Sequence, residues 1–375
     1  MGANDAGPPR PSPDPVAVLR GHRAAVHALA FASPATLVSG DNEGGVRVWD
    51  LGTRRPLAQR DRLIRDGVVA LEYLPGVGGE GCLLVQGRDG LVLSWDLARF
   101  AEDRRAEPTT RFATGCYTFC RFSALGAPAT QAQLVALPGT DGRALEIWNA
   151  RDGTRIAQAA PASCSDSGMC MAVRMAHLPG GEAINVWTGH EDGSIHMWDT
   201  RALGASLASA RFTRQPVTAI DVAADASRDV GEVGGPPGEA APDFTPGWRG
   251  ACSGVDKTVV VFGRAGANGR AAGSGSAAMA ALAQVDLPHK PGTSDLRFRT
   301  DGRLFATAGW DGRVRLFHAG RSKGHGASGR EGKCGRPLAS LKHHRGTCHA
   351  VRFAPEGSML ASAGEDHHVA LWAPF

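Results

Sequence analysis

A hairpin-like stretch recurs along this chain with nearly constant internal spacing, and this recurrence limits the fold more than any other feature. In each copy a run of small and apolar residues leads into Gly, a turn centred on Asp-Gly or a relative follows, and an alternating apolar run closes on an aromatic residue. Two antiparallel strands joined by a tight turn satisfy that pattern. The seven copies close on Trp49, Trp95, Trp148, Trp198, Phe262, Phe317 and Trp372.

Each copy belongs to a longer unit that has room for four strands. Successive closing aromatics lie 46 to 64 residues apart, a further apolar run precedes every hairpin, and a shorter segment follows every closing aromatic. The preceding runs are VHALAF, VVALEYL, CYTFCRF, MCMAVRM, PVTAIDV, SDLRFRT and CHAVRFA. Helical periodicity is absent. The sequence therefore predicts an all-β array of seven four-stranded units.

The two ends of the array are expected to meet. VAVLRGH at 16–22 precedes the first full unit, whereas only three residues follow Trp372, too few for a fourth strand of the seventh unit. A strand at 16–20 would complete that unit and remove the exposed edges that an open array carries. We therefore expect stability to depend on residues 16–20.

Several dipeptides in this array resemble those of a known family. Gly21-His22 and the pairs Trp49-Asp50, Trp95-Asp96 and Trp198-Asp199 resemble the WD-repeat family, which forms β-propellers. The resemblance covers residues 15–375 and implies a seven-bladed WD-repeat β-propeller closed by the N-terminal strand. Residues 1–14 are expected to form a disordered Pro-rich tail, and Gly-, Ala- and Pro-rich insertions near 224–247, 263–281 and 319–335 to form flexible surface loops.

Composition and charge exclude several classes of protein. The 41 Lys and Arg against 37 Asp and Glu give a net charge of +4 with no polybasic run, so we expect no direct nucleic-acid or membrane surface. No apolar stretch is long enough for a membrane span or a signal peptide, which indicates a soluble intracellular protein. The eight cysteines contain no CxxC pair and are expected to be reduced.

A recurring carboxylate stands six residues before most closing aromatics. Five units carry an Asp at this position, namely Asp89, Asp192, Asp256, Asp311 and Asp366. Glu43 stands at this position in the first unit, and Asp141 lies one position earlier in the third. The resemblance implies a structural role, in which the Asp accepts hydrogen bonds from the turn and from a His before the blade. His22 and His344 match that His. The other blades need differently satisfied networks.

Other motifs favour no enzyme. GVGGEG at 76–81 spells GxGxxG but follows a loop and leads into a strand, the reverse of a dinucleotide site. Cys334, His343, His344, Cys348 and His349 are close in sequence, yet their spacing fits no standard zinc site. GxSxG, HExxH and P-loop motifs are absent. We expect no catalytic residue, no cofactor and no metal.

Longer stretches point to one family within the WD repeats. PDPVAVLRG, LVQGRDG, EDGSIHMWD and ATAGWDGRVRLFH occur in an order that resembles the family of ASTRA-associated protein 1, also called guanine nucleotide-binding protein beta subunit-like protein 1. The resemblance implies a non-catalytic scaffold of an ASTRA-like complex, linked to chromatin remodelling. It also implies co-chaperone-assisted maturation of phosphatidylinositol-3-kinase-related kinases, with ASTRA subunits, Triple-T co-chaperone subunits and those kinases as partners. The chain would act as a monomer within a hetero-complex in nucleus and cytoplasm.

A second function stays open. Trp198-Asp199-Thr200-Arg201 matches the WDxR ending that substrate receptors of cullin-RING ubiquitin ligases present to their adaptor. Trp198, Asp199 and Arg201 would then form the adaptor contact.

Trp310 is the most unusual turn residue, because it directly precedes an Asp-Gly turn where small or polar residues are favoured. With Arg313 and Arg315 it is a candidate for partner binding, since exposed Trp and Arg are enriched among interaction hot spots. The alternative is that Trp310 packs on a neighbouring loop and that Arg315 is an ordinary strand residue.

Overall fold

A computed structural model describes residues 12–76, 81–127, 132–159, 165–178, 183–224, 248–264, 279–288, 292–320 and 334–373. Nearly all of the expected tail, most of the three expected insertions and residues 77–80 of the Gly-rich motif lie outside these ranges. The seven cysteines within them are free, as expected. No helix among the described residues is long and apolar enough to cross a membrane.

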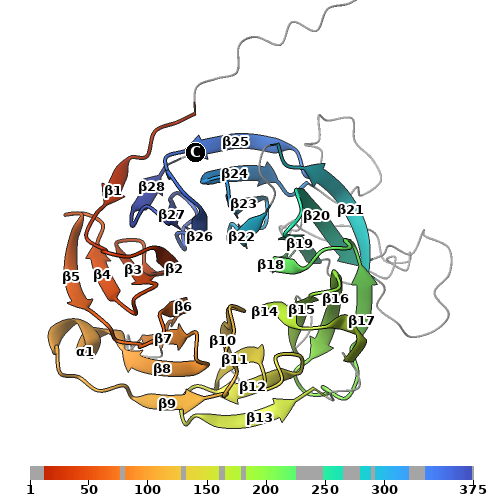
Figure 1. Ribbon diagram of the computed structural model, residues 1–375, viewed down its shortest axis with the longest axis horizontal. Helices are drawn as coiled ribbons and strands as arrows, with labels where there is room; N and C mark the ends of the chain where they lie inside the picture. The colour runs from red at the N-terminus through yellow and green to blue at the C-terminus, as the bar shows by residue number, and fades with distance from the viewer. Residues whose placement is uncertain are drawn as a thin grey trace, which may run out of the picture.

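Seven four-stranded antiparallel sheets surround a central axis, and each contributes one blade of a ring (Figure 1). From the inner strand outward, blade 1 consists of β2 (Val26–Ser33), β3 (Thr36–Asp41), β4 (Val46–Asp50) and β5 (Arg55–Arg60). Blade 2 consists of β6 (Val68–Leu74), β7 (Cys82–Gly87), β8 (Leu91–Asp96) and β9 (Thr110–Ala113). Blade 3 consists of β10 (Ser123–Ala127), β11 (Ala132–Pro138), β12 (Leu145–Asn149) and β13 (Thr154–Gln158).

The second half of the ring repeats this order. Blade 4 consists of β14 (Cys170–His177), β15 (Ile184–His190), β16 (Ser194–Asp199) and β17 (Ala208–Arg211). Blade 5 consists of β18 (Val217–Ala224), β19 (Trp248–Gly254), β20 (Thr258–Arg264) and β21 (Met279–Asp286). Blade 6 consists of β22 (Thr293–Phe298), β23 (Leu304–Gly309), β24 (Arg313–His318) and β25 (Pro337–Lys342). Blade 7 consists of β26 (Cys348–Phe353), β27 (Leu360–Gly364), β28 (Val369–Trp372) and β1 (Ala17–Leu19).

Blade 7 joins the two ends of the chain, so the prediction of a seven-bladed propeller closed by the N-terminal strand is confirmed. Strand β1 pairs with β28 in the register Val18 opposite Ala370, and Val16 N donates to Leu371 O at 2.8 Å. Leu19 is buried in the same cluster as Leu371. The closing strand is therefore held by both backbone pairing and apolar packing.

A glycine near the turn of blade 1 and another near the turn of blade 4 let neighbouring blades pack closely. A Cβ at Gly40 would lie 2.5 Å from Val68, the first residue of the next blade, and one at Gly189 would lie 2.6 Å from Val217. The closing aromatics pack in the interior, where Trp49, Trp198 and Trp372 are fully buried. Alternating apolar positions thus form both the sheets and the contacts between them.

The structure corrects two sequence-based expectations. A short helix, α1 (Leu97–Glu102), follows β8 where only strand and turn were expected, and the Asp96 side chain accepts from Arg99 N at its start. The inner strand of blade 3 begins at Ser123, directly after the whole of the predicted run CYTFCRF at 116–122. The side chains of that run alternate between buried and exposed as in a strand. Hydrogen-bonded pairing with β11, however, begins only at Ser123.

Candidate functional site

Two blades carry a complete network around the recurring carboxylate. In blade 1, His22 Nδ1 donates to Asp41 Oδ2 at 2.6 Å, and Ser39 lies 2.6 Å from His22 Nε2 and accepts from Trp49 Nε1 at 2.7 Å. The spacing predicts Glu43 as the carboxylate of this network, and the structure corrects this to Asp41. The first turn is one residue longer, and Asp41 also accepts from Gly45 N at 2.7 Å. Burial lowers the pKa of His22, which keeps the ring neutral.

Blade 7 repeats this network at the seam of the ring. His344 Nδ1 donates to Asp366 Oδ1 at 2.9 Å, while Ser362 Oγ lies 2.8 Å from His344 Nε2 and accepts from Trp372 Nε1 at 2.9 Å. Burial alone would raise the pKa of Asp366, but the bond from His344 outweighs it and holds that pKa well below its usual range. The carboxylate acts as a fixed acceptor and not as an acid or base.

The other recurring Asp residues are satisfied differently from blade to blade. Asp256 accepts from Thr213 Oγ1 at 2.9 Å, and Asp192 accepts from Ser194 Oγ at 2.6 Å. Asp311 accepts two bonds from Arg315, at 3.0 and 2.5 Å. Asp89 accepts only from Leu91 N, at 3.1 Å, among the bonds of the described residues. The partners lie in the turn, in the strand that follows it, or, for Thr213, in the loop before β18, so these carboxylates are held by structural contacts.

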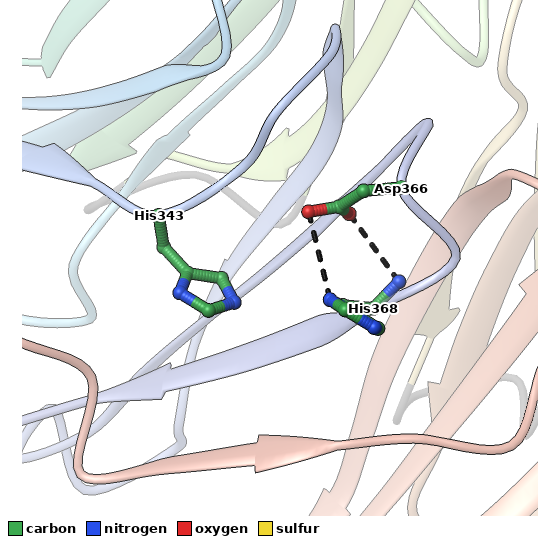
Figure 2. A group of neighbouring side chains, drawn as sticks. All are labelled: His343, Asp366 and His368. Carbon is green, nitrogen blue, oxygen red and sulfur yellow. Dashed lines mark hydrogen bonds and ion pairs between the residues drawn. The ribbon is translucent and has the colours of Figure 1, made fainter.

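Three side chains at the seam lie close enough to suggest a metal site. His343, Asp366 and His368 offer ligand atoms within 4.8 Å of one another (Figure 2). Asp366 is already held by His344, and Arg20, from the end of β1, donates to His368 Nε2 at 2.8 Å. Because Nε2 accepts from Arg20, the ring proton lies on Nδ1, the atom 3.7 Å from Asp366, and a cation bound there would break the Arg20 contact. We therefore assign the group to ring closure.

The Cys and His residues that are close in sequence between 334 and 349 lie in different surroundings. Cys348 is buried in the core, and Cys334 Sγ donates to Ala319 O at 2.9 Å. His349 faces the centre of the ring, where its imidazole lies 4.0 Å from that of His27.

A cavity of about 450 Å³ opens at the centre of one face of the ring. Inner strands of six blades contribute to it near their first residues, and blade 3 contributes Phe119 and Arg121 from the segment before β10. Trp310, in the turn between β23 and β24, lies at the same cavity. This face therefore combines a hollow with exposed aromatic side chains, the features typical of a docking site.

Arg121 crosses the centre of the ring from blade 3. Its guanidinium donates to the carbonyls of Ser294 at 2.9 Å, His27 at 3.2 Å and His349 at 2.6 Å, which belong to blades 6, 1 and 7. It also lies 3.2 Å from Asp295. A single side chain thus ties four blades together and forms the floor of the cavity.

Beneath Arg121 the channel is filled by buried charges. Asp295 contacts Arg352, lies 3.8 Å from Arg297, and accepts from Val351 N at 3.1 Å. Burial would raise the pKa of Asp295, but the surrounding arginines outweigh it and hold that pKa well below its usual range. These contacts hold the described charged side chains of the channel in a structural ionic core.

Sequence reasoning found one aromatic of this face and missed two. Trp310 is 39% exposed, Phe119 67% and Tyr117 61%. The rings of Tyr117 and Phe119 lie edge to face at 6.5 Å, and the Arg88 guanidinium lies 4.7 Å from the Phe119 centroid. The sequence places both in a strand because CYTFCRF is an apolar run that precedes a hairpin. The two large aromatics at outward positions of that run were the available signal for a contact surface.

Trp310 combines packing with exposure. A Cβ on Gly292 would lie 2.1 Å from its indole, so one side of the ring covers the backbone before β22. Arg313 is partly exposed beside it. Arg315 is buried and bonded to Asp311 and to Pro288 O at 3.1 Å, so its predicted place on a contact surface is corrected. The contact candidates are therefore Trp310, Arg313, Phe119 and Tyr117.

The residues of the WDxR ending lie together at the end of β16. Arg201 is largely exposed and donates to Asp199 at 2.8 Å, whereas Trp198 is buried and donates to Thr188 Oγ1 at 2.9 Å. Of the three, only Arg201 presents much of its side chain to solvent.

Acidification is expected to destabilise the ring through the histidines of the cavity. Burial lowers the pKa of His27 to about 3 and that of His349 to about 4, helped by the positive charge of Arg121. The unfolded chain, whose His pKa is near 6.5, therefore binds these protons first as the pH falls. Below pH 6.5 each His should remove about 1.4 kcal/mol of unfolding free energy per pH unit.

Urea unfolding at pH 7, 6 and 5 measures this effect. In His349→Gln the free energy of unfolding should fall less steeply with decreasing pH, because one of the two histidines no longer contributes. Parallel profiles for the variant and the wild type would show that His349 binds its proton in the fold as readily as in the unfolded chain, and would contradict a lowered pKa.

Comparisons with known proteins agree with this architecture. The family model "WD domain, G-beta repeat" matches residues 13–50, 285–318 and 335–373. ASTRA-associated protein 1 of Verticillium alfalfae is 30% identical over 390 residues, covering 94% of this chain and 82% of the relative. Guanine nucleotide-binding protein subunit beta-like protein 1 of Mus musculus is 27% identical over 374 residues, covering 97% of each chain. The alignments thus span the whole ring.

Proposed function

Because the chain belongs to the family of ASTRA-associated protein 1, we propose that it is a non-catalytic adaptor that joins an ASTRA-like complex through the cavity face of its propeller. The observation that carries the proposal is the similarity along nearly the whole chain to proteins named for that association. The described site residues add support, because the recurring carboxylates are held in structural bonds and the exposed aromatics surround a hollow.

Within such an assembly the chain would work with Triple-T co-chaperone subunits in the maturation of phosphatidylinositol-3-kinase-related kinases. It would link that work to chromatin remodelling, and it would act in both nucleus and cytoplasm. A rigid ring suits this role, since docking on a preformed face orders few residues and costs little conformational entropy.

Affinity capture of the tagged chain, with quantitative mass spectrometry of the proteins recovered, tests this proposal. Subunits of an ASTRA-like assembly and of the co-chaperone complex should be enriched over a capture with an unrelated propeller. Enrichment of a cullin-RING adaptor in their place, lost in Arg201→Ala, would overturn the proposal and favour the ligase-receptor function. Arg201 is exposed enough for that substitution to leave the ring intact.

Trp310→Ala is expected to reduce partner recovery with little effect on stability. An exposed Trp at the centre of a docking face typically contributes about 2 kcal/mol to binding, or about a thirtyfold change in Kd. Asp311→Ala is the matched control in the same turn, because it leaves the buried Arg315 unpaired and should mainly lower the melting temperature. A large stability loss in Trp310→Ala with unchanged recovery would assign Trp310 to packing alone.

A further inference from the structure

A second hollow, of about 880 Å³, lies between blades 1 and 2 at the rim of the ring. Its walls come from the loop between β5 and β6 on one side and from the segment between α1 and β9 on the other. We call it the arginine groove, after six of its lining residues: Arg60, Arg62, Arg65, Arg104, Arg105 and Arg111. Figure 1 shows the two connections that form these walls, between β5 and β6 and between α1 and β9.

The charge of the arginine groove is unbalanced. Against its six arginines stand three lining carboxylates, Glu43, Asp89 and Glu107. Apart from Arg60, the arginines are exposed, and none of those five forms a side-chain hydrogen bond or ion pair with another residue that the structure describes. Guanidinium groups match carboxylates in geometry and are more weakly hydrated than ammonium groups. The groove therefore favours an anionic occupant.

Arg60 fixes the wall of the groove before any ligand arrives. Its guanidinium donates to Ala106 O at 2.9 Å and to Asp103 O at 2.6 Å, and it lies 4.2 Å from the centroid of Phe100. The segment that carries Arg104 and Arg105 is thus tied to blade 1. Preorganisation of this kind lowers the entropy cost of binding.

The floor of the groove is apolar, because blade 2 lacks the polar network of blades 1 and 7. Val85 stands at the strand position of Ser39, since each pairs with the residue two before the closing Trp. Ile64 stands four residues before its blade, as His22 does. Leu63, Leu91 and Leu93 line the same floor.

Because blade 2 has Val85 where blade 1 has Ser39, the indole N–H of its closing Trp loses the usual acceptor. Trp95, a lining residue that is 2% exposed, has an indole Nε1 with no hydrogen-bond partner among the described residues. The corresponding Trp49 donates to Ser39 Oγ. A buried unpaired N–H costs about 1–3 kcal/mol, which an acceptor oxygen reaching the floor would recover.

We infer that the arginine groove binds an acidic peptide segment of a partner protein, with carboxylates on the exposed arginines and an apolar side chain on the leucine floor. The three lining carboxylates and the apolar floor disfavour a dense polyphosphate, which would gain nothing from Leu91 and Leu93 and would face Glu43, Asp89 and Glu107. The inference does not depend on which assembly the chain joins.

The test uses the purified full chain and two fluorescein-labelled peptides of equal charge. One is a short peptide of Glu with Leu at every fourth position, and the other carries Ser at those positions. The Leu peptide should bind at least about tenfold more tightly, because only it places apolar groups on the floor. Arg104→Glu/Arg105→Glu should weaken its binding by at least about tenfold.

Arg54→Glu/Arg55→Glu is the matched control, since it changes the net charge equally in exposed residues of blade 1 outside the groove. It should change binding less than about threefold. Equal losses in the two double variants, or equal affinity for both peptides, would reduce the groove to a diffuse surface charge and overturn the inference. Tight binding of inorganic hexaphosphate that the Leu peptide fails to displace would also overturn it.

The Trp95 indole N–H gives an independent readout. Its resonance in an amide spectrum is the one that Trp95→Phe removes, and saturation with the Leu peptide should shift it. An unshifted Trp95 signal at saturation would place the peptide elsewhere and contradict the assignment.

Discussion

Asp295→Ala should lower the free energy of unfolding by about 3–5 kcal/mol, the cost typical of removing one partner from a buried ion pair. Asp295 is the buried carboxylate between Arg121, Arg297 and Arg352, and it also accepts from the backbone N of Val351. Without it, three guanidinium groups would share the channel with less compensating charge. Urea unfolding at neutral pH measures the difference.

Asp301→Ala is the control for that measurement. Asp301 pairs with Arg299 at 2.6 Å, but it is about one third exposed. Water screens such a pair, so the loss should stay below about 1 kcal/mol. Similar losses in both variants would mean that the channel charges do not hold the blades together.

Removal of β1 should have a comparably large effect. Deleting residues 1–20 uncovers the edge of β28 and removes Leu19, which is 2% exposed. Loss of a buried Leu side chain alone costs about 2–5 kcal/mol, and an open strand edge promotes self-association. We expect a clear fall in the melting temperature and oligomers in size-exclusion chromatography.

Deletion of residues 1–11 is the matched control, because it leaves β1 and the contacts of Ser12 in place. That shorter deletion should melt like the full chain. Unchanged melting after deletion of residues 1–20 would show that the ring does not depend on its closing strand.

The fold could be predicted from sequence because the hairpin repeat constrains it at every unit. The recurrence of the closing aromatics predicted the number of blades, and the apolar run at 16–20 before the first full unit predicted the closing strand. Local exceptions escaped the pattern. The helix α1 is too short to show periodicity, although Asp96 is the kind of residue that begins a helix.

The site was predicted less completely, because alternation shows which side chains face outward but not whether a strand finds a partner. Tyr117 and Phe119 alternate as in a strand, yet pairing starts only at Ser123. Fixed spacing also placed Glu43 where the longer turn places Asp41. The burial of Arg315 depends on the hydrogen bonds that its guanidinium donates to Asp311. The spacing of the repeat does not show that these bonds form.

Departures from the repeat held the signal for the arginine groove. Val85 and Ile64 interrupt a polar network that Ser39 and His22 complete in blade 1. The departure is visible only once the units are aligned in register. The fold brings the loop arginines together around this apolar floor. Their spacing in the sequence does not predict it.

Hydrogen exchange of the captured assembly, compared with that of the free chain, tests the central claim most directly. If the ring docks through its cavity face, peptides covering 114–122 and 309–313 should exchange more slowly in the complex. Protection confined to the opposite ends of the blades, with these two segments unchanged, would contradict a docking face built around Phe119 and Trp310.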